Sequence, residues 1–268
     1  MLLFDYHIHT VRCGHAVGTM QQYIDAARNL GLKEIGFSDH IPMYWLPVDK
    51  RSSDLAMSAN ELRQYIEEVY YLQKINSDLN IKLGIEVDFI PGHEKTAKQI
   101  LDNLPLDYIL GSIHYIDDWG FDNPEFMHIY AQWDLMDLYE RYFNNLCKAA
   151  ASGLFDIIAH PDLIKKFGFR PLEDVAVFYE KAARIFGENG VCVEINTAGL
   201  RVPAREIYPS YEFLKLMHKY DVPITVGSDA HRPEHVGYGF QEAFDLIKSV
   251  GYRYLVLFNK RNKMEVKI

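Results

Sequence analysis

The chain has 268 residues, of which 49% are hydrophobic and 24% are charged, a composition that excludes disordered and collagen-like chains. Its formal net charge of −9 disfavours a nucleic-acid partner, because an acidic surface repels polyanions. The three cysteines form no CxxC pair and the N-terminus MLLFDYHIHT lacks an export signal, so we expect a cytoplasmic protein without a membrane partner.

Short apolar, β-branched runs alternate with amphipathic stretches along the chain, as expected for buried parallel strands covered by helices. Together with the chain length, they predict an α/β fold in one domain of residues 1–268, a distorted (β/α)7 barrel of the TIM-barrel type. The predicted strands are Leu2–His7, Glu34–Ser38, Ile81–Val87, Tyr108–Ser112, Phe155–Ala159, Val191–Ile195 and Ile224–Gly227, with a further apolar run at Tyr254–Phe258.

The helices between these strands are predicted partly from their capping residues. Thr19 and Ser58 each precede a Gln or Glu by three residues, the spacing of a capping box, and Gly31 and Gly153 stand where C-terminal caps are expected. The loops after the strands should then build an active site at the C-terminal face of the barrel. The predicted helices are 19–30, 59–77, 94–102, 131–151, 173–188, 210–220 and 239–249.

Histidines and acidic residues follow the predicted strands one after another. His7 and His9 flank Ile8, so in an extended strand both imidazoles point to one side and form half of a metal site. An HxH pair by itself is as often incidental, but five later strands also end in a histidine or a carboxylate, which chance explains poorly. With the loop residue His15, the candidate ligands are His7, His9, His15, His40, Glu86, His114, His160, Asp229 and His231.

This set of ligands is too large for one ion. A zinc ion takes about four ligands and a catalytic site leaves one position for water, so nine ligands with one bridging carboxylate suit three divalent ions. The mixture of nitrogen and oxygen ligands matches zinc, manganese or iron, whereas calcium and magnesium prefer shells made of oxygen alone.

The motifs DYHIHT, GFSDH, GIEVDF, GSIHYI, DIIAHPDL and GSDAH occur in this order between residues 5 and 231. They resemble the successive motifs of the PHP (polymerase and histidinol phosphatase) family of metal-dependent phosphoesterases. The resemblance implies that the complete ligand pattern is divided among three ions. One ion is held by His7, His9, Glu86 and Asp229, a second by Glu86, His114 and His160, and a third by His15, His40 and His231.

Two further segments, HPDLIKKFG and EINTAGLR, resemble most the monofunctional histidinol-phosphate phosphatases of this family. This resemblance implies a phosphoric monoester hydrolase that converts L-histidinol phosphate to L-histidinol and phosphate in histidine biosynthesis. Metal binding lowers the pKa of water from about 15.7 to about 7, so a hydroxide that bridges two ions is the expected nucleophile. Glu86 and Asp229 are the residues expected to hold these ions.

Basic, acidic and aromatic residues near the ligands are candidates for substrate binding. Arg201 follows the sixth strand, where a guanidinium can bind two phosphate oxygens and assist catalysis. Lys166 lies on the loop after His160 and can add positive charge. Histidinol phosphate carries an ammonium and an imidazole, for which Glu194 offers a carboxylate and Tyr115 a ring.

Three other interpretations stay open. A PHP phosphatase or phosphodiesterase for another small phosphate ester or a nucleotide would carry the same ligands. A non-catalytic metal-binding module that serves a partner protein is disfavoured by the complete ligand set. An amidohydrolase barrel shares the HxH pair and the final aspartate but often has a carbamylated lysine where this chain has His114.

Overall fold

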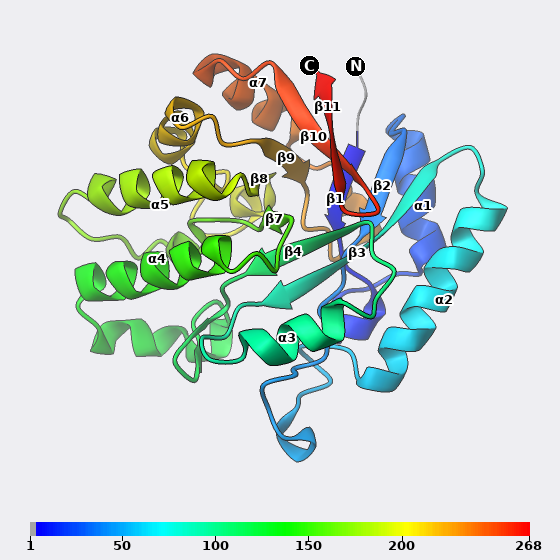
Figure 1. The fold of residues 1–268 in the computed structure, drawn as a ribbon, viewed down its shortest axis with the longest axis horizontal. Helices are drawn as coiled ribbons and strands as arrows, with labels where there is room; N and C mark the ends of the chain where they lie inside the picture. Colours follow the sequence, from blue (N-terminus) through cyan, green and yellow to red (C-terminus); the bar gives the residue numbers. More distant parts are fainter. Residues whose placement is uncertain (1–3) are drawn as a thin grey trace.

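A computed structural model describes residues 4–268 and contains one sheet of seven parallel strands (Figure 1). Each strand coincides, to within a few residues, with one of the seven predicted runs, although the predicted start at Leu2 lies outside the described residues. In sheet order the strands are β1 (Phe4–Ile8), β2 (Glu34–Phe37), β3 (Asn80–Asp88), β4 (Tyr108–Ser112), β7 (Ile157–Ile158), β8 (Cys192–Asn196) and β9 (Ile224–Gly227).

The sheet curls into a nearly closed barrel where β9 returns to β1. Ile8 and Ala230 form a parallel β-bridge. The N–H of His9 donates to Ala230 O at 2.9 Å, and the N–H of Ala230 donates to His7 O at 3.0 Å. The prediction of a distorted (β/α)7 barrel is therefore confirmed.

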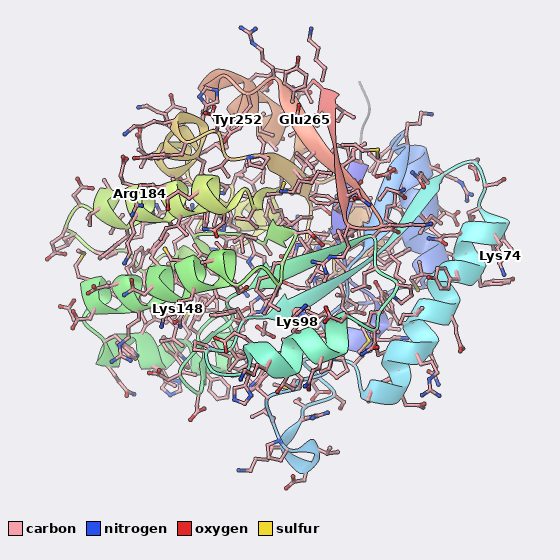
Figure 2. The ribbon with its side chains drawn as sticks, in the orientation of Figure 1. Lys74, Lys98, Lys148, Arg184, Tyr252 and Glu265 are labelled. Atoms are coloured by element: carbon pink, nitrogen blue, oxygen red, sulfur yellow. The ribbon has the colours of Figure 1, made fainter. Side chains whose placement is uncertain are left out.

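Seven α-helices lie around the outside of the sheet (Figure 1). Thr19 and Ser58 form the predicted capping boxes, and charged side chains such as Lys98, Lys148 and Arg184 lie on the exposed helix faces (Figure 2). No helix within residues 4–268 is both long and apolar enough to cross a bilayer. The helices are α1 (Met20–Asn29), α2 (Ala59–Ile75), α3 (Glu94–Leu101), α4 (Leu135–Ala151), α5 (Ala176–Asn189), α6 (Tyr211–Lys219) and α7 (Phe240–Val250).

The largest error in the predicted helices concerns the segment before α4. The helix predicted over 131–151 begins only at Leu135, because the Asp134 carboxylate caps it by accepting the N–H of Met136 at 2.9 Å. The preceding residues Pro124–Gln132 form 3-10 turns instead. The other short 3-10 helices are Val11–Cys13, Val48–Lys50, Leu163–Lys165, Ala198–Arg201 and Pro233–His235.

Aromatic rings fill the N-terminal end of the barrel. Tyr6 and Tyr108 stack with ring centroids 4.8 Å apart, and the Tyr6 hydroxyl accepts the N–H of Phe258 at 3.1 Å. Gly36 and Gly84 have no Cβ, and one added at either position would collide with the Tyr108 ring. These rings fill this end of the barrel, and the Tyr6 hydroxyl also donates to the buried carboxylate of Glu34.

Two antiparallel hairpins are added to the barrel. The apolar run predicted at 254–258 belongs to the hairpin of β10 (Tyr254–Asn259) and β11 (Asn262–Lys267), which lies outside the seven-stranded sheet (Figure 1). The other hairpin, β5 (Tyr115–Ile116) and β6 (Trp119–Gly120), lies in the loop between β4 and α4. It brings residues 121–123 back toward the rim, because the N–H of Phe121 donates to His114 O at 3.1 Å.

Candidate metal centre

The structure brings all nine predicted ligands together at the C-terminal ends of the strands. Each is contributed by a barrel strand or by the first residues after it, except for His15, which comes from the longer loop between β1 and α1. His7 lies on β1 and Glu86 on β3, while His9, His40, His114, His160, Asp229 and His231 follow the ends of β1, β2, β4, β7 and β9.

Glu86 lies at the centre of this cluster. The hydroxyl of Ser112 donates to its Oε1 and helps to fix the carboxylate. Five histidine nitrogens lie within 3.6 Å of its two oxygens: His7 Nε2 at 3.2 Å, His9 Nε2 at 3.4 Å and His40 Nδ1 at 3.2 Å from Oε2, and His160 Nε2 at 3.0 Å and His114 Nε2 at 3.6 Å from Oε1.

Asp229 forms a second focus on the other side of His9. Its Oδ1 lies 3.2 Å from His9 Nε2, 3.3 Å from His231 Nδ1 and 3.8 Å from His7 Nε2. The rings of His9 and His231 stack with centroids 4.0 Å apart, and the His15 ring lies 4.8 Å from that of His231. The two carboxylates thus divide the histidines into overlapping groups.

His15 is held in a defined tautomer by two backbone carbonyls. Its Nδ1 lies 2.8 Å from Cys13 O and 3.0 Å from Asp54 O. A carbonyl only accepts hydrogen bonds, so Nδ1 carries the proton and Nε2 has a free lone pair. Asp54 belongs to the long segment between β2 and α2, which extends from the barrel in Figure 1.

Two ligand positions have an unusual backbone conformation. His160 has a φ of 56° and Asp229 a φ of 52°, in the left-handed region that side chains other than glycine rarely adopt. Each is the second residue after a barrel strand, where this conformation turns the chain sharply at the rim. Strain of this kind persists where the surrounding structure enforces it, commonly at functional sites.

The burial and charge of the cluster fit divalent cations. Glu86 and His7 are at most 1% exposed, and His7 Nε2 has no hydrogen-bond partner within residues 4–268. Burial alone would raise the pKa of Glu86, but the surrounding histidines hold it well below its usual range, so the carboxylate stays charged. Several sets of three ligand atoms, such as those of His7, His9 and Glu86, lie within 4.8 Å of one another. This geometry suits coordination of metal ions.

Glu194 is buried behind the candidate metal ligand His7 and orients its ring. The Nδ1–H of His7 donates to Glu194 Oε1 at 2.7 Å, and Asn196 Nδ2 donates to Oε2 at 2.9 Å. Glu194 is only 1% exposed. A Cβ at Gly227 would collide with this carboxylate and with His7, so the position admits only glycine. Glu194 was predicted to bind substrate, and the contact that the structure gives it is with the candidate ligand His7, whose ring it orients.

Asp88 orients a second ligand and was missed by the sequence analysis. The Nδ1–H of His114 donates to Asp88 Oδ1 at 2.8 Å, which leaves His114 Nε2 facing Glu86. A signal was present, because Asp88 lies two residues after Glu86 on the same strand and such residues share a face.

The other predicted substrate-binding residues lie on different sides of the rim. Arg201 Nη2 donates to Ser228 O at 2.7 Å and to Asp229 O at 3.0 Å, while its buried Nη1 has no partner in the described part of the chain. Lys166 Nζ donates to Asp122 Oδ2 at 3.0 Å. The Tyr115 ring packs edge-on against Trp45, with centroids 5.3 Å apart.

Metal uptake is expected to release one or more protons per chain near neutral pH, because the pKa values of several candidate ligands are raised. Without metal, burial lowers the pKa of His114, but Asp88 and other carboxylates outweigh it and raise this pKa to about 9. The pKa of His7 is likewise raised, against burial, by Glu194 and Asp229. A metal ligand must offer an unprotonated nitrogen, so metal binding has to displace protons held by these rings. Zinc titration in weakly buffered dye solution measures the release.

The pH dependence and a variant provide the controls for this proton count. Metal binding should weaken as the pH falls below about 9, because protons then compete for His114. Asp88→Asn removes the main carboxylate that raises this pKa, so its proton release at pH 7 should be smaller. Metal uptake at pH 7 without proton release would contradict the proposed ligand set.

A β/α barrel that presents seven histidines and two carboxylates at the C-terminal ends of its strands has the architecture of a metal-dependent hydrolase. The PHP domain family matches residues 5–198, and a PHP-associated family matches residues 212–249. The chain belongs to the PHP domain family.

Relatives resemble the chain over most of its length. A Deinococcus radiodurans protein named probable histidinol-phosphatase is 40% identical over 261 residues, which cover 97% of this chain and 98% of the relative. The histidinol-phosphatase of Bacillus subtilis is 29% identical over 90% of this chain and 97% of its own length. A crystal structure of the Lactococcus lactis histidinol phosphate phosphatase, complexed with zinc, L-histidinol and phosphate, has a TM-score of 0.83 at 22% identity, covering 97% of this chain and 98% of that chain. At this identity the likeness concerns the fold.

Proposed function

We propose that the chain is a metal-dependent phosphomonoesterase that hydrolyses L-histidinol phosphate to L-histidinol and phosphate. The observation that carries the proposal is the buried cluster of histidines around Glu86 and Asp229, in a chain whose full-length relatives are named histidinol-phosphatases. A cytoplasmic location is part of the proposal, as the composition of the chain suggests.

The proposed metal content is three ions of zinc, manganese or iron. His7, His9, Glu86 and Asp229 would hold one ion, Glu86, His114 and His160 a second, and His15, His40 and His231 a third. When bound, such ions lower the pKa of water and neutralise charge on phosphate oxygens. Glu194 and Asp88 support this assignment, because each accepts a hydrogen bond from Nδ1–H of a ligand histidine and so turns Nε2 toward the other ligands.

Arg201 and Lys166 are the proposed phosphate-binding residues. Arg201 is anchored through Nη2 to the backbone around Asp229, so its free Nη1 lies next to a proposed ligand and can donate to a phosphate oxygen. Lys166 supplies a second positive charge beside the loop of His114. Tyr115 remains the proposed aromatic surface for the departing alcohol, since its ring is half-buried near Asp122.

The substrate comparison tests this function directly. We expect histidinol phosphate to be hydrolysed with a higher kcat/KM than an aryl phosphomonoester. A bis-aryl phosphodiester should be a poor substrate, because the phosphate-binding residues of the site suit a dianionic monoester. Steady-state kinetics on the metal-loaded enzyme, with elemental analysis of the same sample, measure both quantities. The analysis should give two to three ions per chain, as expected for a cluster with more ligands than one ion uses.

Two results would contradict the proposal in different ways. A nucleotide or a diester that is hydrolysed faster than histidinol phosphate would overturn the substrate, although the metal centre would stand. A content of less than one ion per chain after reconstitution with zinc, manganese or iron would overturn the metal centre itself. Full loading with no turnover of any phosphate ester would favour a non-catalytic module.

A further inference from the structure

Most carboxylates around the metal centre have their hydrogen-bond partners within the protein. Apart from the ligands, they accept hydrogen bonds from backbone N–H groups, from ligand histidines or from a buried lysine. The carboxylates with such partners are Asp5, Asp39, Asp88, Asp162 and Glu194.

Asp122 differs from these residues. Within residues 4–268 its carboxylate has one hydrogen-bond partner, Lys166 Nζ at 3.0 Å, and the two side chains are 24% and 23% exposed. It is thus half-buried at the rim and paired with a side chain that is itself partly accessible. Asp122 is a charged group whose partner can be exchanged when a ligand arrives.

The backbone fixes Asp122 beside the metal centre. The preceding residue, Phe121, is fully buried and donates its N–H to His114 O at 3.1 Å. His114 follows β4 at the rim, so this hydrogen bond holds the backbone next to Asp122 against the loop of a candidate ligand. Tyr115 belongs to the same hairpin, where it pairs with Gly120, two residues before Asp122.

Histidinol phosphate carries its ammonium two carbons from the ester oxygen, so the ammonium stays close to the phosphate. A residue that recognises the ammonium must therefore lie next to a group that binds phosphate. Asp122 meets this requirement, because its partner Lys166 is a proposed phosphate-binding residue. We propose that Asp122 forms an ammonium subsite that selects phosphate esters of 2-amino alcohols, an inference that rests on the function proposed above.

Selection follows from an exchange of ion pairs. Before binding, Lys166 and Asp122 neutralise each other. When Lys166 turns to a phosphate oxygen, Asp122 loses its cation and is left half-buried, which is costly unless another cation replaces it. The ammonium of the substrate restores the balance, so one ion pair becomes two. An ester without an amine leaves the carboxylate unpaired and is disfavoured.

A comparison of two substrates on two proteins tests the subsite. The substrates are histidinol phosphate and its deaminated analogue, imidazolylpropyl phosphate, and the proteins are the wild type and Asp122→Asn, both metal-loaded. We expect Asp122→Asn to lower kcat/KM for histidinol phosphate by about 10- to 100-fold, as for loss of a charged hydrogen bond. It should leave kcat/KM for the analogue within about threefold. The amine preference of the wild type should then disappear.

Two controls separate recognition from folding and from positioning of Lys166. Asp118→Asn changes an exposed aspartate of the same loop and should leave kcat/KM for both substrates unchanged. Lys166→Met should lower kcat/KM for both substrates by a similar factor, because both carry the phosphate. Inhibition constants add a readout without turnover: Asp122→Asn should weaken inhibition by L-histidinol and leave inhibition by inorganic phosphate unchanged.

The outcomes are distinct. An equal loss of kcat/KM on both substrates in Asp122→Asn would show that Asp122 only positions Lys166, and it would overturn the subsite. An amine preference that is unchanged in Asp122→Asn would also overturn it. The same comparison with 2-aminoethyl phosphate and ethyl phosphate does not depend on histidinol. If histidinol phosphate were not hydrolysed but Asp122→Asn abolished a preference for the aminoethyl ester, the proposed function would fall and the subsite would stand.

Discussion

Replacing Glu86 with glutamine is expected to lower kcat by on the order of a thousandfold and to reduce the metal content of the purified protein. The Glu86 carboxylate lies within 3.6 Å of nitrogens from five ligand histidines. An amide keeps the shape of the side chain but removes the charge that balances divalent cations. Steady-state kinetics and elemental analysis of one preparation measure both effects.

A control distinguishes this result from a general loss of structure. Glu67→Gln changes an exposed glutamate on α2 and should leave turnover and metal content unchanged. Circular dichroism should show that Glu86→Gln keeps its helices, because the barrel core is made by other residues. Near-normal turnover of Glu86→Gln at matched metal content would remove Glu86 from the centre of the mechanism.

Replacing Asp162 with alanine is expected to lower the free energy of unfolding by about 3 kcal/mol or more. Lys165 is 1% exposed, and its Nζ lies 2.7 Å from Asp162 Oδ2 and 2.8 Å from Glu206 Oε2. Asp162 also accepts the N–H of Ser210 at 2.8 Å. Its removal leaves a buried ammonium and a backbone N–H without their main acceptor, as denaturation in urea would detect.

Two further variants test the cause of that loss. Lys166→Met changes the neighbouring lysine, whose ion pair is partly exposed, and should cost less than about 1 kcal/mol. In Asp162→Asn/Lys165→Met the uncompensated charge is absent, so part of the lost stability should return. A double variant that is less stable than Asp162→Ala would show that the buried charge is not the cause.

The sequence was sufficient for the barrel and for the candidate ligands because both depend on local order along the chain. A buried parallel strand is recognised in the sequence as a short apolar run. A residue that follows such a strand lies at the C-terminal rim of the barrel, independently of distant parts of the chain. His160 and Asp229 illustrate this, since each is the second residue after the end of its strand. Their left-handed backbone, by contrast, has no signature in the residue type.

The partners of the ligands could not be predicted because they are chosen by three-dimensional packing. Glu194 was predicted to bind substrate. In the structure its carboxylate contacts His7, which lies 187 positions earlier in the chain. Asp122 was overlooked because its importance depends on the β5–β6 hairpin, which returns it to His114. Lys165 and Lys166 are adjacent in sequence, but one is buried in an ion-pair network and the other is accessible at the rim.

The junction that closes the barrel between β1 and β9 lies among the candidate metal ligands. The bridge from Ile8 to Ala230 joins the first and last strands of the barrel, and candidate ligands stand on both sides of it. His7 and His9 belong to one edge of the junction, and Asp229 and His231 to the other. An ion bound by ligands from both edges would link the first strand of the barrel to the last. Separation of the two strands would then require release of that ion, so metal binding would also stabilise the closed barrel.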